Sequence, residues 1–90
     1  MVRFYILAEG RVQGVGFRYH AVMVANKYNI TGYAKNLSNG SVEIEAQGEE
    51  ASISKFLEEV KRGNGFAKVT SLYKENIPLK NSEKSFKPLY

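Results

Sequence analysis

Alternation of hydrophobic and polar residues predicts four strands along the chain. The stretches with this pattern are residues 2–10, 29–36, 41–48 and 66–75. In SVEIEAQG (41–48), the apolar Val42, Ile44 and Ala46 alternate with polar residues, which is typical of a strand with one buried face. In VRFYILAEG (2–10), the even-numbered apolar positions are predicted to face the core, and Arg3 lies on the opposite face.

Apolar residues at helical spacing predict two helices between these strands. The apolar positions of the first helix are Phe17, Ala21, Val24, Ala25 and Tyr28. The second helix has the clearer pattern, a single apolar stripe of Ile53, Phe56, Leu57 and Val60. Acidic residues precede this stripe and basic residues follow it, as the helix dipole favours, and Gly63 is a typical stop signal.

The predicted order is strand, helix, strand, strand, helix, strand. The Asn-Gly pair at 39–40 indicates a hairpin between the second and third strands. Two split βαβ units with right-handed crossovers give an α+β fold, a ferredoxin-like α/β sandwich (βαββαβ) with two helices on one face of an antiparallel sheet. The tail SFKPLY (85–90) is compatible with a short extra strand, which Pro88 would confine to an edge. We expect one domain over residues 1–90.

The stretch GRVQGVGFRYH (10–20) joins the first strand to the first helix and contains three glycines. Either a tight turn or a loop that approaches a ligand closely would account for this glycine content. The position at a helix N-terminus favours an anion ligand, because unpaired amides and the helix dipole attract negative charge there. Gly14 and Gly16 can turn successive amides inward, and Arg18 adds a guanidinium suited to two phosphate oxygens. The loop has neither the Gly-Lys-Ser/Thr ending of a P-loop nor the glycine spacing of a dinucleotide-binding motif.

Two motifs resemble the signatures of the acylphosphatase family. They are GRVQGVGFR (10–18) and GYAKNLSNGSVEIEAQG (32–48), in which Asn36 stands four residues after Gly32. The element order and the apolar stripe of the second helix also fit this family, so the resemblance covers nearly the whole chain. The departures are peripheral: GNG (63–65) replaces a turn that usually contains proline, and Pro88 interrupts the last segment.

The resemblance implies a metal-independent acylphosphatase that hydrolyses acyl phosphates to a carboxylate and inorganic phosphate, without a cofactor. It implies that Arg18 binds the phosphate and that Asn36 orients the attacking water. The implied substrate-binding segment consists of the backbone amides of Gln13, Gly14, Val15, Gly16, Phe17 and Arg18. Inorganic phosphate is expected both as a product and as a competitive inhibitor. From the residues alone, Asn36 is more typical of a residue that caps the turn before Asn39.

Composition narrows the remaining function classes. The chain has 43% hydrophobic and 24% charged residues, which is ordinary for a globular protein. It has no cysteine and only one histidine, which excludes thiol chemistry and argues against an all-protein zinc site. The lack of cysteine fits a reducing cytoplasm, and no apolar run approaches the length of a membrane span. The net charge of +4 is compatible with a phosphate ligand or with nucleic acid. We expect a cytoplasmic monomer that binds a small acyl phosphate and neither nucleic acid nor membrane.

Two alternatives come from other classes of protein. An RNA-binding module of the same fold would suit the basic charge, but Glu43 and Glu45 are predicted to face outward, where they would repel phosphates. No aromatic-rich RNA-recognition motif is present either. The second alternative is a carbamoyl-phosphate-handling module like the acylphosphatase-like part of hydrogenase-maturation proteins. Those proteins continue into zinc-binding and catalytic regions, whereas this sequence ends at Tyr90.

Several single residues also have purely structural interpretations. Arg18 could be an ordinary solvated helix residue. His20 lies two positions further along the same helix, so it is predicted to point away from Arg18 and receives no role. Tyr5, Tyr33 and Tyr73 are more typical of sheet packing than of ligand contacts.

Overall fold

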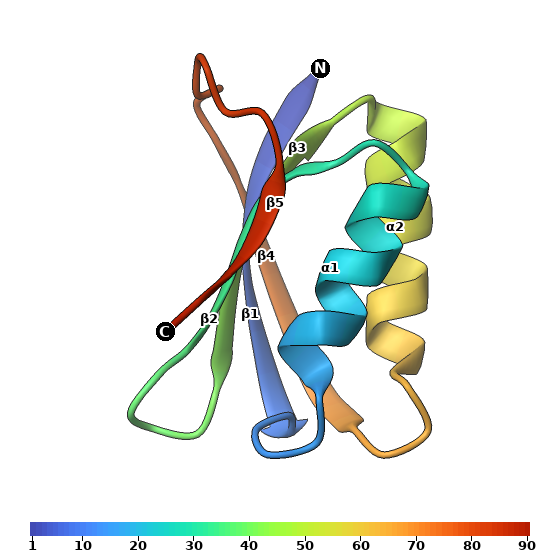
Figure 1. The fold of residues 1–90 in the computed structure, drawn as a ribbon, viewed down its shortest axis with the longest axis vertical. Coiled ribbons are helices and arrows are strands. Elements are labelled where there is room, and N and C mark those ends of the chain that lie inside the picture. The colour runs from blue at the N-terminus through green and yellow to red at the C-terminus, as the bar shows by residue number, and fades with distance from the viewer.

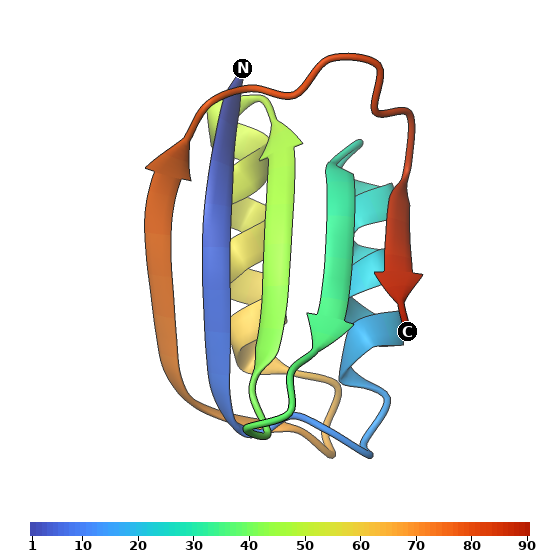
Figure 2. The same ribbon diagram turned by 90° about the vertical axis from the view of Figure 1, so that its left-hand side faces the viewer.

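In the computed structural model, which describes residues 1–90, two helices cover one face of a five-stranded sheet (Figure 1). The elements in chain order are β1 (Val2–Arg11), α1 (Phe17–Lys27), β2 (Thr31–Asn36), β3 (Val42–Gly48), α2 (Glu50–Arg62), β4 (Lys68–Ile77) and β5 (Phe86–Leu89). The other face of the sheet carries no helix, and Figure 2 shows it with the strands in the order β4-β1-β3-β2-β5. The predicted α+β ferredoxin-like fold is confirmed. Neither helix has the length and apolar character needed to cross a membrane.

The sheet is mixed, because its last strand runs parallel to its neighbour. β1 to β4 pair antiparallel and form the predicted antiparallel sheet. β5 is added parallel to β2, with Phe86 opposite Gly32 and Leu89 opposite Lys35. The strand lies at one edge of the sheet, which is where a strand that contains Pro88 can be accommodated.

The hydrophobic core lies between the sheet and the two helices. All four residues of the predicted α2 stripe are buried. The buried residues of α1 are Phe17, Ala21, Val24 and Ala25, and those of the central strands include Ile6, Ala8, Ala34, Val42, Ile44 and Ala46. Because Phe17, the first residue of α1, is itself part of this core, the start of the helix is held in place against the sheet.

A bulge at the end of β1 directs the chain into the glycine-rich loop. The pairing register between β1 and β4 shifts between Glu9 and Gly10. Gly10 has a φ of 122°, and a Cβ atom there would lie 2.2 Å from the carbonyl oxygen of Lys68. Glycine is therefore needed where the chain leaves the sheet, because two backbones approach each other closely at this point.

The open face of the sheet carries a buried arginine that the alternation pattern did not predict. Arg3 is on the face away from the helices, as its position in β1 requires, but its side chain is only 1% exposed. Segment 78–85, which connects β4 to β5, crosses one end of this face (Figure 2). Arg3 forms ion pairs of 2.8 Å with Glu45 in β3 and with Glu83 in the crossing segment. This cluster attaches the connection to the sheet.

Candidate active site

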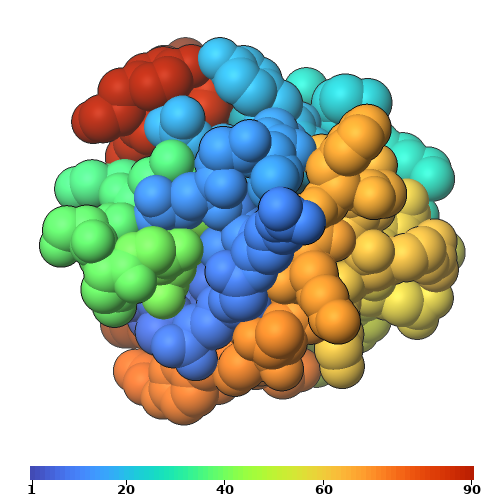
Figure 3. Space-filling view, turned by 90° about the horizontal axis from the view of Figure 1, so that it is seen from below, coloured from blue at the N-terminus to red at the C-terminus, as the bar shows by residue number.

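Three loops that are far apart in the sequence meet at the end of the molecule where α1 begins. Figure 3 shows this end, with the glycine loop (12–16, blue) between the β2–β3 loop (37–41, green) and the α2–β4 loop (63–67, orange). A cavity of about 110 Å³ lies here. It is lined by Val12, Gly14, Gly16, Phe17, Arg18, Tyr19 and Asn36. The cavity therefore brings together Arg18 and Asn36, which belong to separate motifs in the sequence.

The glycine loop presents unpaired backbone amides next to this cavity. Gly14 and Gly16 have φ values of 73° and 75°, in the left-handed region that favours glycine. None of the N–H groups from Gln13 to Gly16 donates to another backbone group, and Gly16 caps α1 without a side-chain hydrogen bond. The first amides of α1 also lack backbone partners, because the first turn of any helix has no preceding carbonyl groups to accept from them. The loop is thus equipped to accept an anion.

Arg18 is held by the C-terminal strand. Its Nη1 atom donates to the carbonyl oxygen of Leu89 at 2.7 Å, and the centre of its guanidinium lies 4.7 Å from the centroid of the Tyr90 ring. Hydrogen bonding with Tyr19, whose hydroxyl is 2.6 Å from that of Tyr90, raises the pKa of Tyr90. The bond to Leu89 is the only hydrogen bond that the guanidinium makes within the protein, so its other donors remain free for a ligand. No sequence pattern indicated this contact, because the two residues are 71 positions apart.

Asn36 ends β2 and carries an unpaired polar atom. Its Oδ1 atom is buried, yet it has no hydrogen-bond partner in the protein. Leaving a buried acceptor without a partner costs about 1–3 kcal/mol, so an atom of this kind normally meets a water, an ion or a ligand. Because Asn36 also lines the cavity, this oxygen is available to a molecule bound there.

The glycine loop is fastened to the loops on both sides. The side chain of Gln13, which was predicted only as a backbone donor, donates from Nε2 to the carbonyl oxygens of Leu37 and Ser41 at 2.7 and 2.9 Å. The carbonyl oxygen of Val15 accepts a hydrogen bond of 2.8 Å from Nδ2 of Asn64 in the α2–β4 loop. Gln13 and Val15 do not line the cavity through their side chains, and Asn64 was not identified from the sequence at all.

His20 and the three tyrosines assigned to sheet packing lie away from the cavity, as predicted, whereas Tyr19 is part of its lining. The Nε2 atom of His20 is 3.1 Å from the backbone carbonyl oxygen of Glu59, so the ring bridges the two helices. Tyr33 and Tyr5 project on the open face and donate hydrogen bonds to Glu43 at 2.8 and 3.2 Å. Burial and the hydrogen bond to Glu43 raise the pKa of Tyr33. Tyr73 donates in the same way to Glu75 at 2.6 Å.

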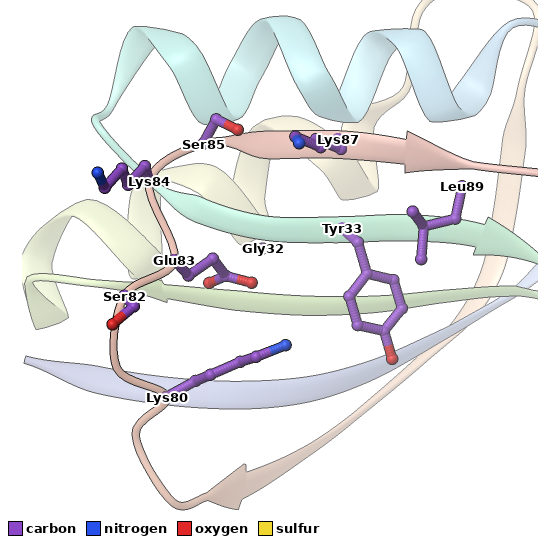
Figure 4. Close-up of a pocket in the computed structure, with 9 residues that line it drawn as sticks. All are labelled: Gly32, Tyr33, Lys80, Ser82, Glu83, Lys84, Ser85, Lys87 and Leu89. Atoms are coloured by element: carbon purple, nitrogen blue, oxygen red, sulfur yellow. The ribbon is translucent and has the colours of Figure 1, made fainter.

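A larger hollow of about 390 Å³ lies on the open face, between β2, β5 and segment 80–85 (Figure 4). Its lining includes Tyr33, Glu83 and three lysines, Lys80, Lys84 and Lys87. The hollow contains neither Arg18 nor Asn36, and Glu83 is already paired with Arg3. The smaller cavity, where the unpaired amides, the guanidinium and the unpaired carboxamide oxygen meet, is therefore the candidate active site.

Comparison with known proteins shows the family to which the chain belongs. The acylphosphatase family model matches residues 4–88. An acylphosphatase of Clostridium acetobutylicum is 51% identical over 90 residues, which cover 100% of this chain and 99% of the relative. The crystal structure of acylphosphatase from Bacillus subtilis superposes with a TM-score of 0.95 at 40% identity and covers 100% of both chains. HypF from T. kodakarensis matches with a TM-score of 0.87 at 31% identity, over 100% of this chain but 12% of that protein.

The chain belongs to the acylphosphatase family. Members of this enzyme class hydrolyse the carboxyl–phosphate bond of acyl phosphates, so the predicted enzyme class and reaction are confirmed. The Clostridium relatives that match over 99–100% of their own length are named acylphosphatases. The RNA-binding alternative loses its support, because the open face carries Glu43 and Glu45 as predicted and the match is to hydrolases.

Proposed function

We propose that the small cavity binds the phosphoryl group of an acyl phosphate between the amides of residues 13–18 and the guanidinium of Arg18. The free amides, the dipole of α1 and the fixed arginine all favour the same dianionic group. These groups stabilise the negative charge on the three non-bridging phosphate oxygens, both in the bound substrate and in the transition state. Phosphoryl transfer passes through a loose transition state, so positioning and charge stabilisation supply most of the catalysis.

The leaving group requires little help from the enzyme. A carboxylate leaves as the conjugate base of an acid with a pKa of about 4, so no general acid has to protonate it. The residues that line the cavity include no carboxylic acid and no histidine, which agrees with a site that needs no proton donor. The same lining offers a metal ion no carboxylate, imidazole or thiolate ligand. Arg18 and the amides are the groups that can balance the phosphate charge, and we therefore propose catalysis without a metal ion.

The unpaired Oδ1 of Asn36 is the observation that carries the proposal. A water molecule in the cavity can donate one hydrogen bond to this buried oxygen and direct its lone pair at the phosphorus atom. The carboxamide orients the water but does not deprotonate it, so the proton passes to an oxygen of the substrate's own phosphate. The products are a carboxylate and inorganic phosphate, and atoms and charges balance without a further reactant.

The geometry of the cavity supports a proposal about inhibition and oligomeric state, and the composition supports one about location. Inorganic phosphate presents the same oxygens as the transferred group, so it should compete with the substrate for the amides and Arg18. The cavity is complete within one chain, which supports catalysis by a monomer. A chain without cysteine requires no oxidising compartment, and we place it in the cytoplasm.

Replacement of Asn36 by alanine tests the proposal. Turnover of benzoyl phosphate should fall by about a hundredfold or more, as when one preorganised group is removed from a transition state. The inhibition constant of inorganic phosphate should stay nearly unchanged, because Asn36 contacts the water and not the phosphoryl group. The turnover number and the inhibition constant are both measured in steady-state assays at several phosphate concentrations.

Asn39→Ala is the matched control in the neighbouring turn. The Oδ1 atom of Asn39 accepts only a local hydrogen bond of 3.0 Å from the Ser41 amide. If Asn36 were merely a turn residue, both variants would lose thermal stability and keep normal turnover. A folded Asn36→Ala enzyme with normal turnover would therefore contradict the assignment of the water.

A further inference from the structure

Asn64 makes three hydrogen bonds that join the α2–β4 loop to the glycine loop. Its Oδ1 atom accepts from the amides of Phe66 and Ala67 at 3.0 and 2.9 Å. Its Nδ2 atom donates to the carbonyl oxygen of Val15 at 2.8 Å. One carboxamide therefore folds its own loop and at the same time holds a peptide group of the neighbouring loop. Figure 3 shows these two loops in contact at the end of the molecule that contains the cavity.

The peptide group that Asn64 holds is the one between Val15 and Gly16. In a trans peptide the C=O and N–H bonds lie in one plane and point in opposite directions. A hydrogen bond that fixes the carbonyl of Val15 toward Asn64 thus turns the amide of Gly16 away from it. That amide has no partner in the protein, and Gly16 lines the cavity.

We infer that Asn64 is a positioning residue for the anion-binding amides: it holds the Val15–Gly16 peptide in the orientation that directs the Gly16 N–H into the cavity. This inference rests on the proposed role of the glycine loop. Gly16 has a φ of 75°, and the alternative rotation of this peptide costs glycine little, so glycine alone does not fix the direction of the amide. A Cβ atom at Gly16 would lie 3.5 Å from Nδ2 of Asn64, which shows how closely the two loops approach.

The Gly16 amide would contact the phosphoryl group both before and during reaction. Loss of the Asn64 bond should therefore weaken phosphate binding and turnover together, unlike loss of Asn36. Removal of one stabilising donor costs about a hundredfold or more, and an amide that is free to rotate still points inward part of the time. We therefore expect phosphate affinity to fall by about tenfold, which is more than no effect and less than the loss of a donor altogether.

Titration of 15N-labelled protein with inorganic phosphate, followed by NMR, tests the inference. Asn64→Ser is the principal variant, because a serine oxygen can still accept from the amides two or three residues on but cannot reach Val15. Asn64→Ala provides a second variant that lacks both functions. We expect the Gly16 amide resonance of the wild-type protein to shift on titration, and the affinity of both variants to fall about tenfold.

Gly65→Ala is the control for damage to the loop as a whole. Gly65 has a φ of 93°, and a Cβ atom there would meet open space, so alanine strains the loop and leaves the Asn64 bond in place. Its phosphate affinity should equal that of the wild type even though its melting temperature falls. Wild-type affinity in Asn64→Ser, or an equal loss of affinity in Gly65→Ala, would overturn the inference. Absence of any phosphate-induced shift at residues 13–18 of the wild type would instead overturn the proposed function.

Discussion

Arg18, the proposed phosphate ligand, is supported by the end of the C-terminal strand. A backbone carbonyl rather than a carboxylate holds one edge of the guanidinium, so the side chain is oriented without neutralisation of its charge. The Tyr90 ring on the guanidinium adds attraction of the cation–π type and also leaves the charge intact. The full positive charge is thus kept for the substrate.

Replacement of Arg18 should affect binding and catalysis together. We expect Arg18→Ala to lower kcat/KM for benzoyl phosphate by about a hundredfold or more. Arg18→Lys should recover little of this loss, because the ammonium is a compact point charge on a flexible stem and cannot copy the planar fork that faces Leu89 and two phosphate oxygens from different nitrogen atoms. The inhibition constant of phosphate should rise in both variants, in contrast to Asn36→Ala. Near-normal phosphate inhibition in a folded Arg18→Ala protein would place the anion elsewhere.

At the scale of residues, the sequence predicted the type of chemistry better than it predicted the residues that hold the site in place. Arg18 and Asn36 were singled out because they stand in long local motifs, and the structure places both in the lining of one cavity. The partners Leu89 and Asn64 were not found, since their contacts bridge 71 and 49 positions and use backbone atoms that any residue offers. The burial of Arg3 was missed for a similar reason: the alternation pattern shows which face a residue occupies but not which segment crosses that face.

At the scale of elements, the connection between β4 and β5 depends on charge rather than on apolar burial. Arg3 donates to Glu83 from two nitrogen atoms, at 2.8 and 3.3 Å, and Glu83 is 13% exposed. Burial of Glu83 opposes its ionisation, but the hydrogen bonds and charge of Arg3, together with a hydrogen bond from Thr31 and the charge of Lys80, hold the pKa of Glu83 below its usual value. The attached segment leads directly into β5, whose last residue supports Arg18.

Glu83→Gln should therefore destabilise the protein in a pH-dependent manner. Because the pKa of Glu83 is lower in the folded state, the ion pair stabilises the protein above the unfolded-state pKa of about 4.3. This contribution is lost as the pH falls through the lower folded-state value. At neutral pH we expect Glu83→Gln to reduce the free energy of unfolding by about 1–3 kcal/mol. Urea denaturation at several pH values measures the difference, which should vanish in acid.

A matched control removes an exposed carboxylate instead. Glu58 is 77% exposed and pairs with Arg62 at 3.5 Å along α2. We expect Glu58→Gln to change the free energy of unfolding by less than about 0.5 kcal/mol. An equal effect of the two substitutions, or an effect of Glu83→Gln that is independent of pH, would show that the Arg3 cluster does not attach this segment.

The elements that the sequence predicted well are those with one face in the core. Where boundaries differ, local hydrogen bonds and backbone conformation explain the difference. β4 was predicted from residue 66 but begins at Lys68, because Asn64 holds the amides of Phe66 and Ala67 in a turn. β2 was predicted from residue 29 but begins at Thr31, because Asn29 adopts a left-handed φ of 56° after α1. The parallel direction of β5 was not predictable, since a four-residue edge strand carries no signal for its orientation.

At the scale of the whole molecule, the fold alone does not determine the function. Helices on one face and an open sheet on the other are compatible with many activities. In this chain the open face is occupied by paired glutamates, tyrosines and Arg3, whereas the buried Oδ1 of Asn36, which has no partner in the protein, lies at the end where α1 begins. This unsatisfied group, rather than the topology, is the basis for the proposed substrate site.

Phosphate release from benzoyl phosphate and from phenyl phosphate, compared under the same conditions in the presence of EDTA, tests the central claim most directly. The two substrates share an aromatic ring and a phosphoryl group and differ in the leaving group. Benzoyl phosphate releases a carboxylate, whereas phenyl phosphate releases a phenolate, whose conjugate acid has a pKa of about 10. A site without a general acid or a metal ion should hydrolyse benzoyl phosphate and leave phenyl phosphate essentially intact. Comparable turnover of both substrates, or activity that appears only when Mg²⁺ replaces EDTA, would contradict this account.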